Sequence, residues 1–152
     1  ENMYKLPMLP VGLPVYPWWV AFNQLSELPV QLLEGRFQLL INHLLDKLLI
    51  NKDAINDFDR SVYSHHYNNR ENISASNAWY QTFGEDIAEQ KAYPKIKNPT
   101  KGIASSATLD ILDSFLSQNV FEYEMMEIEG CGHFLPEEKP EQIAKAISDF
   151  LK

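Results

Sequence analysis

The stretch GCGHFLPEEKPE, residues 130–141, places a histidine between glycines and a proline, directly after a segment with the pattern of a strand. In that segment, VFEYEMMEIEG, apolar residues are interspersed with glutamates, which favours a strand. The following segment, PEQIAKAISDFLK, presents Ile143, Ile147 and Phe150 on one face of a predicted helix with Pro140 in its first turn. His133 is therefore predicted on a loop between a strand and a helix. There the histidine either takes part in catalysis or is simply exposed to solvent or bonded to a neighbouring backbone group.

A strand and a helix are also predicted immediately upstream. The segment KIKNPTKGIASS predicts a short strand within residues 95–106, and ATLDILDSFLSQN predicts a helix over residues 107–119. The order strand, helix, strand, helix implies two parallel strands joined by a crossover. Because parallel strands are normally buried on both faces, we expect residues 94–152 to be the edge of a larger α/β sheet. His133 then falls at the carboxyl end of the pair, where open α/β sheets place their active sites.

The rest of the chain has no convincing strand pattern. Residues 1–15 are rich in proline and predict a linker, and residues 16–93 predict an all-helical unit. In its leucine-rich segment, apolar residues recur every three or four positions, and Gly35 predicts an irregularity. The other predicted helices are residues 52–67 capped by Asn51, residues 70–83 capped by Asn69 and stopped near Gly84, and residues 85–93 ended by Pro94.

Composition excludes several functional classes. The chain has 152 residues, 45% of them hydrophobic and 22% charged, which is typical of a folded globular protein. Its net charge of −8 disfavours nucleic acids and anionic membrane surfaces as partners. A single cysteine, Cys131, cannot form an internal disulfide, so we expect a reducing, cytoplasmic location. No apolar run is long enough to span a membrane, and no residue spacing resembles a zinc site, so we expect no metal and no cofactor.

Several motifs together resemble one enzyme family. A strand, the pattern G-x-G-H-F-x-x-E-E-x-P-E and a terminal amphipathic helix are similar to the end of many α/β-hydrolase-fold enzymes. The helical region resembles the cap domain of the epoxide hydrolase and haloacetate dehalogenase branch, and the resemblance runs from about residue 16 to residue 152. The cap motifs that carry it are Trp18-Trp19-Val20-Ala21-Phe22-Asn23-Gln24, Leu28-Pro29, Leu32-Leu33, Gly35-Arg36, and Trp79-Tyr80-Gln81 with Asp86.

The resemblance implies a fold and a mechanism. The implied fold is α/β: a linker over residues 1–15, a helical cap over residues 16–93, and the last two parallel strands and helices of an α/β-hydrolase core over residues 94–152. The implied role of His133 is that of a general base, which activates water against a covalent ester intermediate. The family nucleophile, Asp or Ser, sits on a turn of the type G-x-D/S-x-G. No two of the six glycines have that spacing, so the chain is expected to be a C-terminal fragment that is inactive alone.

Three further residues are candidates for the site. Asp110 is the carboxylate nearest to the usual position of the triad acid; alternatively, the acid follows an earlier strand and Asp110 only favours the start of a helix. Trp19 and Tyr80 match cap residues that contact the substrate, and both could instead belong to an aromatic core. For Trp79 we expect the core role.

Two functions from different classes remain open. The first is hydrolysis of a small ester, epoxide or carbon–halogen substrate, with a small molecule as the only partner apart from a second copy of the chain. The second is a truncated, non-catalytic interaction module that associates with itself or with a partner protein. Under both hypotheses we expect a homodimer, because an open sheet edge and an uncovered apolar face invite pairing.

Overall fold

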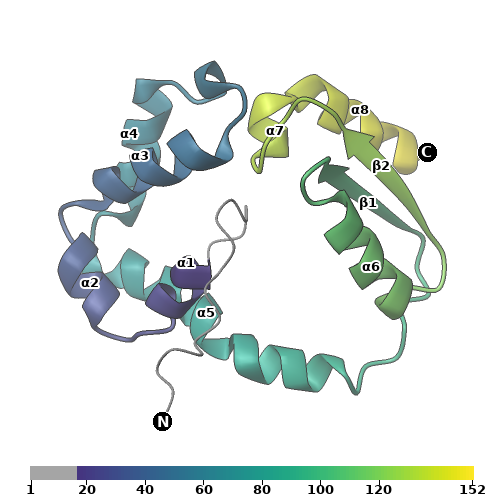
Figure 1. Ribbon diagram of the computed structural model, residues 1–152, viewed down its shortest axis with the longest axis horizontal. Helices are drawn as coiled ribbons and strands as arrows, with labels where there is room; N and C mark the ends of the chain where they lie inside the picture. The colour runs from purple at the N-terminus through teal and green to yellow at the C-terminus, as the bar shows by residue number, and fades with distance from the viewer. Residues whose placement is uncertain (1–16) are drawn as a thin grey trace, which may run out of the picture.

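The computed structural model describes residues 17–152, so the predicted linker over residues 1–15 lies outside the described residues. Residues 17–90 form only helices, and residues 100–150 alternate between strands and helices. We call residues 17–93 the helical region and residues 94–152 the strand–helix region. Figure 1 shows the two regions arranged as an open ring, in which α5 runs from one to the other and α7 meets the helical region again.

The helical region begins with two short helices and a break at glycine. Helices α1 (Pro17–Asn23) and α2 (Leu28–Leu33) precede α3 (Phe37–Leu48). Between α2 and α3, Gly35 has a φ of 73°, a left-handed conformation that glycine adopts without a steric penalty. The irregularity predicted at Gly35 is therefore confirmed, and it divides the leucine-rich segment into two helices.

The next helix starts later than the sequence interpretation predicted. Asn51 caps only the short 3-10 helix η2 (Lys52–Ala54), whereas α4 (Asp57–Tyr67) begins after Asn56. The Asn56 side chain accepts hydrogen bonds from the amides of Phe58 and Asp59, and the Asp59 carboxylate accepts one from the Asn56 amide. This reciprocal capping box satisfies more free amides than a cap at Asn51. The prediction of a single helix over residues 52–67 is therefore wrong, because η2 and α4 are separate.

A second correction concerns α5 (Arg70–Gln90), which passes through Gly84 without interruption. Gly84 does not adopt the positive φ that would make it a helix-ending residue. The Asn69 side chain accepts a hydrogen bond from the Asn72 amide, as predicted for its capping role. The two helices predicted on either side of Gly84 are thus one long helix, which spans the distance between the two regions (Figure 1).

Two apolar clusters hold the helical region together. Val30, Phe37, Leu40 and Ile73 form the first, with Trp19 packed against it. Leu45, Leu49 and Ile55 form the second, and Phe134 from the strand–helix region packs against that one. The second cluster therefore joins the loop after His133 to the helical region by apolar burial.

The strand–helix region contains the predicted parallel pair. Strands β1 (Thr100–Ser105) and β2 (Tyr123–Ile128) pair in parallel, with Thr100 opposite Tyr123 and Ser105 opposite Ile128. Helix α6 (Leu109–Asn119) connects them, and α7 (Leu135–Glu138) and α8 (Pro140–Phe150) follow. In Figure 1, α6 and α8 lie on opposite sides of the pair. The sequence analysis did not predict α7. None of the helices within residues 17–152 has the length and apolar character needed to cross a membrane.

Candidate active site

The loop that carries His133 is held by its backbone. Gly130 turns the chain after β2 with a φ of 62°, and Cys131 is buried with its Sγ–H donating to the Ile128 carbonyl, 3.2 Å away. The His133 amide donates to the carbonyl of Leu48 in the helical region, 3.0 Å away, while its side chain is exposed. Burial, reinforced by the charge of Glu138, raises the pKa of the Cys131 thiol, which keeps it protonated and inert.

Gly132 has a different role from Gly130. A Cβ at residue 132 would lie 2.0 Å from the Leu48 carbonyl oxygen and 2.9 Å from Oε1 of Glu138. Gly130 is needed for its positive φ, which Gly132 does not share. At Gly132 the reason is the close approach of two backbone segments. The histidine thus lies on a loop pressed directly against the end of α3.

The two cap candidates contact each other. Nε1 of Trp19 donates a hydrogen bond to the hydroxyl oxygen of Tyr80 over 2.7 Å. Their rings meet edge to face, with centroids 5.9 Å apart, and the Tyr80 ring also packs on Phe83. The Tyr80 oxygen accepts from the indole, and a hydroxyl that accepts can also donate its own proton to another group. Trp19 and Tyr80, 61 positions apart in the sequence, therefore form one hydrogen-bonded pair surrounded by aromatic rings.

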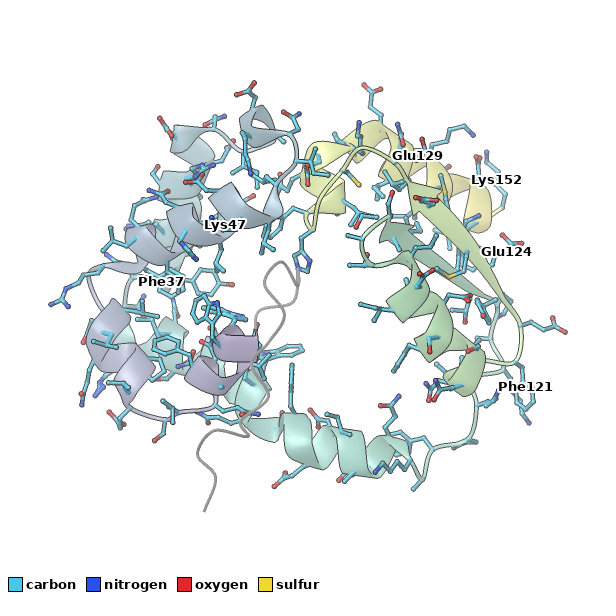
Figure 2. The ribbon with its side chains drawn as sticks, viewed as in Figure 1. Phe37, Lys47, Phe121, Glu124, Glu129 and Lys152 are labelled. Atoms are coloured by element: carbon cyan, nitrogen blue, oxygen red, sulfur yellow. The ribbon has the colours of Figure 1, made fainter. Side chains whose placement is uncertain are left out.

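A cavity of about 660 Å³ lies in front of this pair. Side chains from both regions line it, mostly apolar ones, and they include Trp19, Tyr80 and Phe83 from α1 and α5, and Phe134 and Glu137 from the strand–helix region. The His133 ring meets Phe134 edge to face at 5.2 Å. Figure 2 shows that some side chains of each region point toward the opening of the ring, while most point outward. The cavity, the Trp19–Tyr80 pair and the His133 loop thus belong to one side of the molecule.

Trp79 departs from its predicted role. It is 75% exposed and lines the cavity, so the expectation of a core tryptophan is wrong. The buried positions on this part of α5 are Ile73 and Asn77, and Trp79 lies on a different face of the helix from both.

A second polar contact reaches across the cavity wall. The hydroxyl of Tyr63 on α4 donates to Oε1 of Glu137 on α7, 2.5 Å away. This hydrogen bond, with burial and the charge of Glu137, raises the pKa of Tyr63 to about 12. The phenol therefore stays neutral at physiological pH and acts here as a donor that ties the two regions together.

The remaining candidates are less well placed. Asp110 is exposed in the first turn of α6, just beyond the carboxyl end of β1, and within the described residues no hydrogen bond or ion pair joins it to His133. Residues 17–152 also contain no group of three or more His, Cys, Asp or Glu side chains that could hold a metal ion.

Comparisons with solved structures agree with this architecture. Cfl2 from Burkholderia cenocepacia is 26% identical, with a TM-score of 0.81 over 95% of this chain and 53% of that chain. The Cif epoxide hydrolase from Acinetobacter nosocomialis is 17% identical, with a TM-score of 0.83 over 89% of this chain and 45% of that one. The epoxide hydrolase CorEH is 22% identical, with a TM-score of 0.79 over 94% of this chain and 52% of that one.

No protein-family model and no curated protein sequence matches the chain. The chain spans about half the length of the solved structures that it matches. The fold class predicted from the sequence is confirmed by these likenesses and by the parallel pair of strands. The chain therefore has an α/β-hydrolase fold like that of the epoxide hydrolases, of which it spans the helical cap and the C-terminal part of the core.

Proposed function

We propose that the chain supplies the cap and the general base of a hydrolase that acts through a covalent ester intermediate. In this proposal His133 activates the water that hydrolyses the intermediate. Trp19 and Tyr80 contact a small-molecule ester, epoxide or carbon–halogen substrate, and Tyr80 donates a proton or hydrogen bond to its leaving oxygen or halide. The similarity to proteins described as epoxide hydrolases makes the epoxide the first substrate class to test.

One observation carries this proposal. An exposed histidine follows the carboxyl end of a parallel strand, and its ring packs on Phe134, which lines the same apolar cavity as the hydrogen-bonded Trp19–Tyr80 pair. A general base beside an apolar cavity that also contains a phenolic donor suits hydrolysis of an uncharged substrate. We assign the triad acid either to Asp110 or to a residue outside this sequence.

The sequence has no nucleophile on a G-x-D/S-x-G turn, so we expect the 152-residue chain to be inactive alone. We place the boundary between cap and core at residues 93 and 94, because α5 ends at Gln90 and Ile96 already pairs with Val120. We also propose a cytoplasmic location, since Cys131 has no second cysteine to pair with.

The experiment starts from the coding sequence that precedes Glu1. We define the extended protein as this chain together with any in-frame polypeptide encoded there. We expect a strand followed by G-x-D/S-x-G in that polypeptide, and hydrolysis of small epoxides or activated esters by the extended protein only. His133→Gln should lower the rate by about 10²–10⁴-fold. An in-frame start directly before Glu1, or hydrolysis by the repurified 152-residue chain, would contradict the proposal.

Within the same protein, Tyr80→Phe tests the cap assignment. It removes only the hydroxyl that accepts from Trp19, so we expect a larger loss in rate than in stability. Trp19→Phe should behave similarly. A thermal melt beside a rate measurement separates the two effects, and unchanged activity per folded molecule would assign both residues to the aromatic core.

A second candidate function, a self-associating interaction module, has its own support. The strand–helix region exposes apolar side chains that a partner would cover, namely Ile96, Ile111, Phe115, Phe121, Ile147 and Phe150. We propose that the isolated chain forms a homodimer through this region. Sedimentation equilibrium should give twice the monomer mass of 17.6 kDa. A stable monomer that does not bind a dye for exposed apolar surface would contradict the dimer.

A further inference from the structure

Glu138 is a buried carboxylate that no feature of the proposed mechanism uses. It lies at the end of α7 and is only 6% exposed. Among residues 17–152 it forms no ion pair with a lysine, arginine or histidine. A buried carboxylate is costly unless donors satisfy it, so its partners indicate why it is there.

Those partners are three backbone amides from two segments that lie far apart in the sequence, the loop before His133 and the residues just beyond the end of α3. Oε1 accepts from the Gly132 amide at 2.7 Å. Oε2 accepts from the amides of Ile50 and Asn51, at 2.9 and 2.8 Å, just beyond the end of α3. One side chain thus bonds the loop before His133 and the helical region at the same time, over a sequence separation of 88 residues.

The neighbouring contacts close this junction on both sides. The His133 amide donates to the Leu48 carbonyl at 3.0 Å, and Gly132 leaves no room for a Cβ between Leu48 and Glu138. The histidine backbone is therefore fixed by one hydrogen bond to the helical region and by the Glu138 bond to the residue before it. Any shift of the end of α3 must move both bonds.

We propose that Glu138 is a positioning residue that couples the place of the His133 side chain to the place of the helical cap. The carboxylate binds the loop through Gly132 and the cap through Ile50 and Asn51. The His133 side chain is therefore positioned beside the cavity only when the cap is docked. The consequence for catalysis rests on the proposed function of His133. The coupling itself concerns only the described contacts and is tested separately.

The Glu138→Gln substitution distinguishes positioning from simple stabilisation. A glutamine has one acceptor oxygen and one donor NH₂ group, so it cannot accept from both segments at once. The oxygen retains the most hydrogen bonds when it faces Ile50 and Asn51, which leaves an NH₂ group facing the Gly132 amide. We therefore expect the Gly132 and His133 amides to lose protection while those of Ile50 and Asn51 keep most of theirs.

The measurement is residue-resolved amide hydrogen exchange of the 152-residue chain by NMR, with relaxation of the His133 ring as a second readout. In Glu138→Gln we expect the Gly132 and His133 amides to exchange about tenfold faster or more, and the ring to become more mobile. In Glu138→Ala we expect all four amides at the junction to exchange faster. Amides of β1 and β2 report whether the rest of the fold is intact.

The matched control is Glu141→Gln, an exposed glutamate in the first turn of α8. It changes the same charge three residues away and should leave the junction amides unaffected. Unchanged exchange at Gly132 and His133 in both Glu138 variants would overturn the proposal. Faster exchange throughout the strands in both variants would also overturn it, because Glu138 would then stabilise the whole fold without positioning the loop. Neither result bears on whether the extended protein hydrolyses a substrate.

Discussion

The helical and strand–helix regions meet at two junctions that differ in construction. At the α7 junction several short, part-buried hydrogen bonds run mainly between backbone amides and the buried carboxylate of Glu138, with Gly132 closely packed beside it. At the α5 junction the chain simply continues through an exposed helix end, supported by a side-chain hydrogen bond of 3.1 Å between Gln90 and Asn119. Figure 1 shows the two junctions on opposite sides of the ring.

The difference indicates separate roles for the two connections. A junction of backbone hydrogen bonds around a buried carboxylate tolerates little displacement, because each lost bond leaves a polar group unsatisfied. A solvated helix end with one side-chain bond tolerates more. Residues 84–89 at that end of α5, Ile87 among them, are exposed, which leaves this part of the helix with little packing of its own. We therefore expect the α7 junction to set the geometry of the site and the α5 junction to act as a tether.

The largest expected effect on stability comes from Gly132→Ala. A methyl group 2.0 Å from the Leu48 carbonyl must separate the two segments, and overpacking of this kind costs about 1–3 kcal/mol. Gly84→Ala is the matched control, because a Cβ there meets nothing within 4 Å and alanine favours a helix interior by about 1 kcal/mol. Urea denaturation should show changes of opposite sign, and equal changes would contradict the close approach at Gly132.

A smaller effect is expected at the other junction. Gln90→Ala removes the part-buried hydrogen bond to Asn119, and a single neutral hydrogen bond contributes about 1 kcal/mol. We expect the free energy of unfolding to change by no more than this, and the amides around His133 to keep their exchange rates. A loss as large as that of Gly132→Ala would make the two junctions equivalent and remove the distinction between them.

The smallest effect at neutral pH is expected from Tyr63→Phe, because the hydrogen bond to Glu137 that it deletes is exposed to solvent. Because the folded pKa of about 12 lies above the ordinary value of 10.0, the folded state keeps its proton longer than the unfolded state. The contribution to stability is therefore complete below pH 10 and is lost as the pH rises to about 12.

Unfolding measured between pH 9 and pH 12 checks this contribution. The original chain should lose more stability over the interval than Tyr63→Phe does, and ultraviolet titration should find one late-ionising tyrosine fewer in the variant. Identical pH dependence in both proteins would place the Tyr63 hydroxyl outside the junction.

The sequence could predict those features of the structure that are caused by residues close together in the chain. The loop of His133 and the parallel pair follow from short patterns of apolar residues, glycine and proline, and both are present. The late start of α4 also has a local signal, since Asn56 has Asp59 at the third helical position and Asn51 has no such partner. That signal was available in the sequence and outweighs the cap at Asn51.

The other features arise from contacts between distant segments. Glu138 was missed because two of its three partners are backbone amides 87 and 88 residues away, and backbone amides have no sequence signature. Trp19 and Tyr80 could be paired only through a family resemblance, because 61 residues separate them. The role of Gly132 depends on the carbonyl of Leu48, which lies far from it in the sequence.

We propose that His133 activates the water that hydrolyses a covalent ester intermediate. With an Asp nucleophile His133 is not needed to form that intermediate, whereas a Ser nucleophile would need it as a base in both steps. The most direct measurement is the intact mass of the extended protein with His133→Gln, recorded after addition of substrate. With an Asp nucleophile we predict a stable adduct, with the mass of the whole substrate for an epoxide and of the substrate minus its leaving group for an ester or carbon–halogen compound. We predict no adduct when the nucleophile of the G-x-D/S-x-G turn is also replaced. Steady turnover by the His133→Gln variant at the original rate, with no adduct, would exclude His133 as the general base.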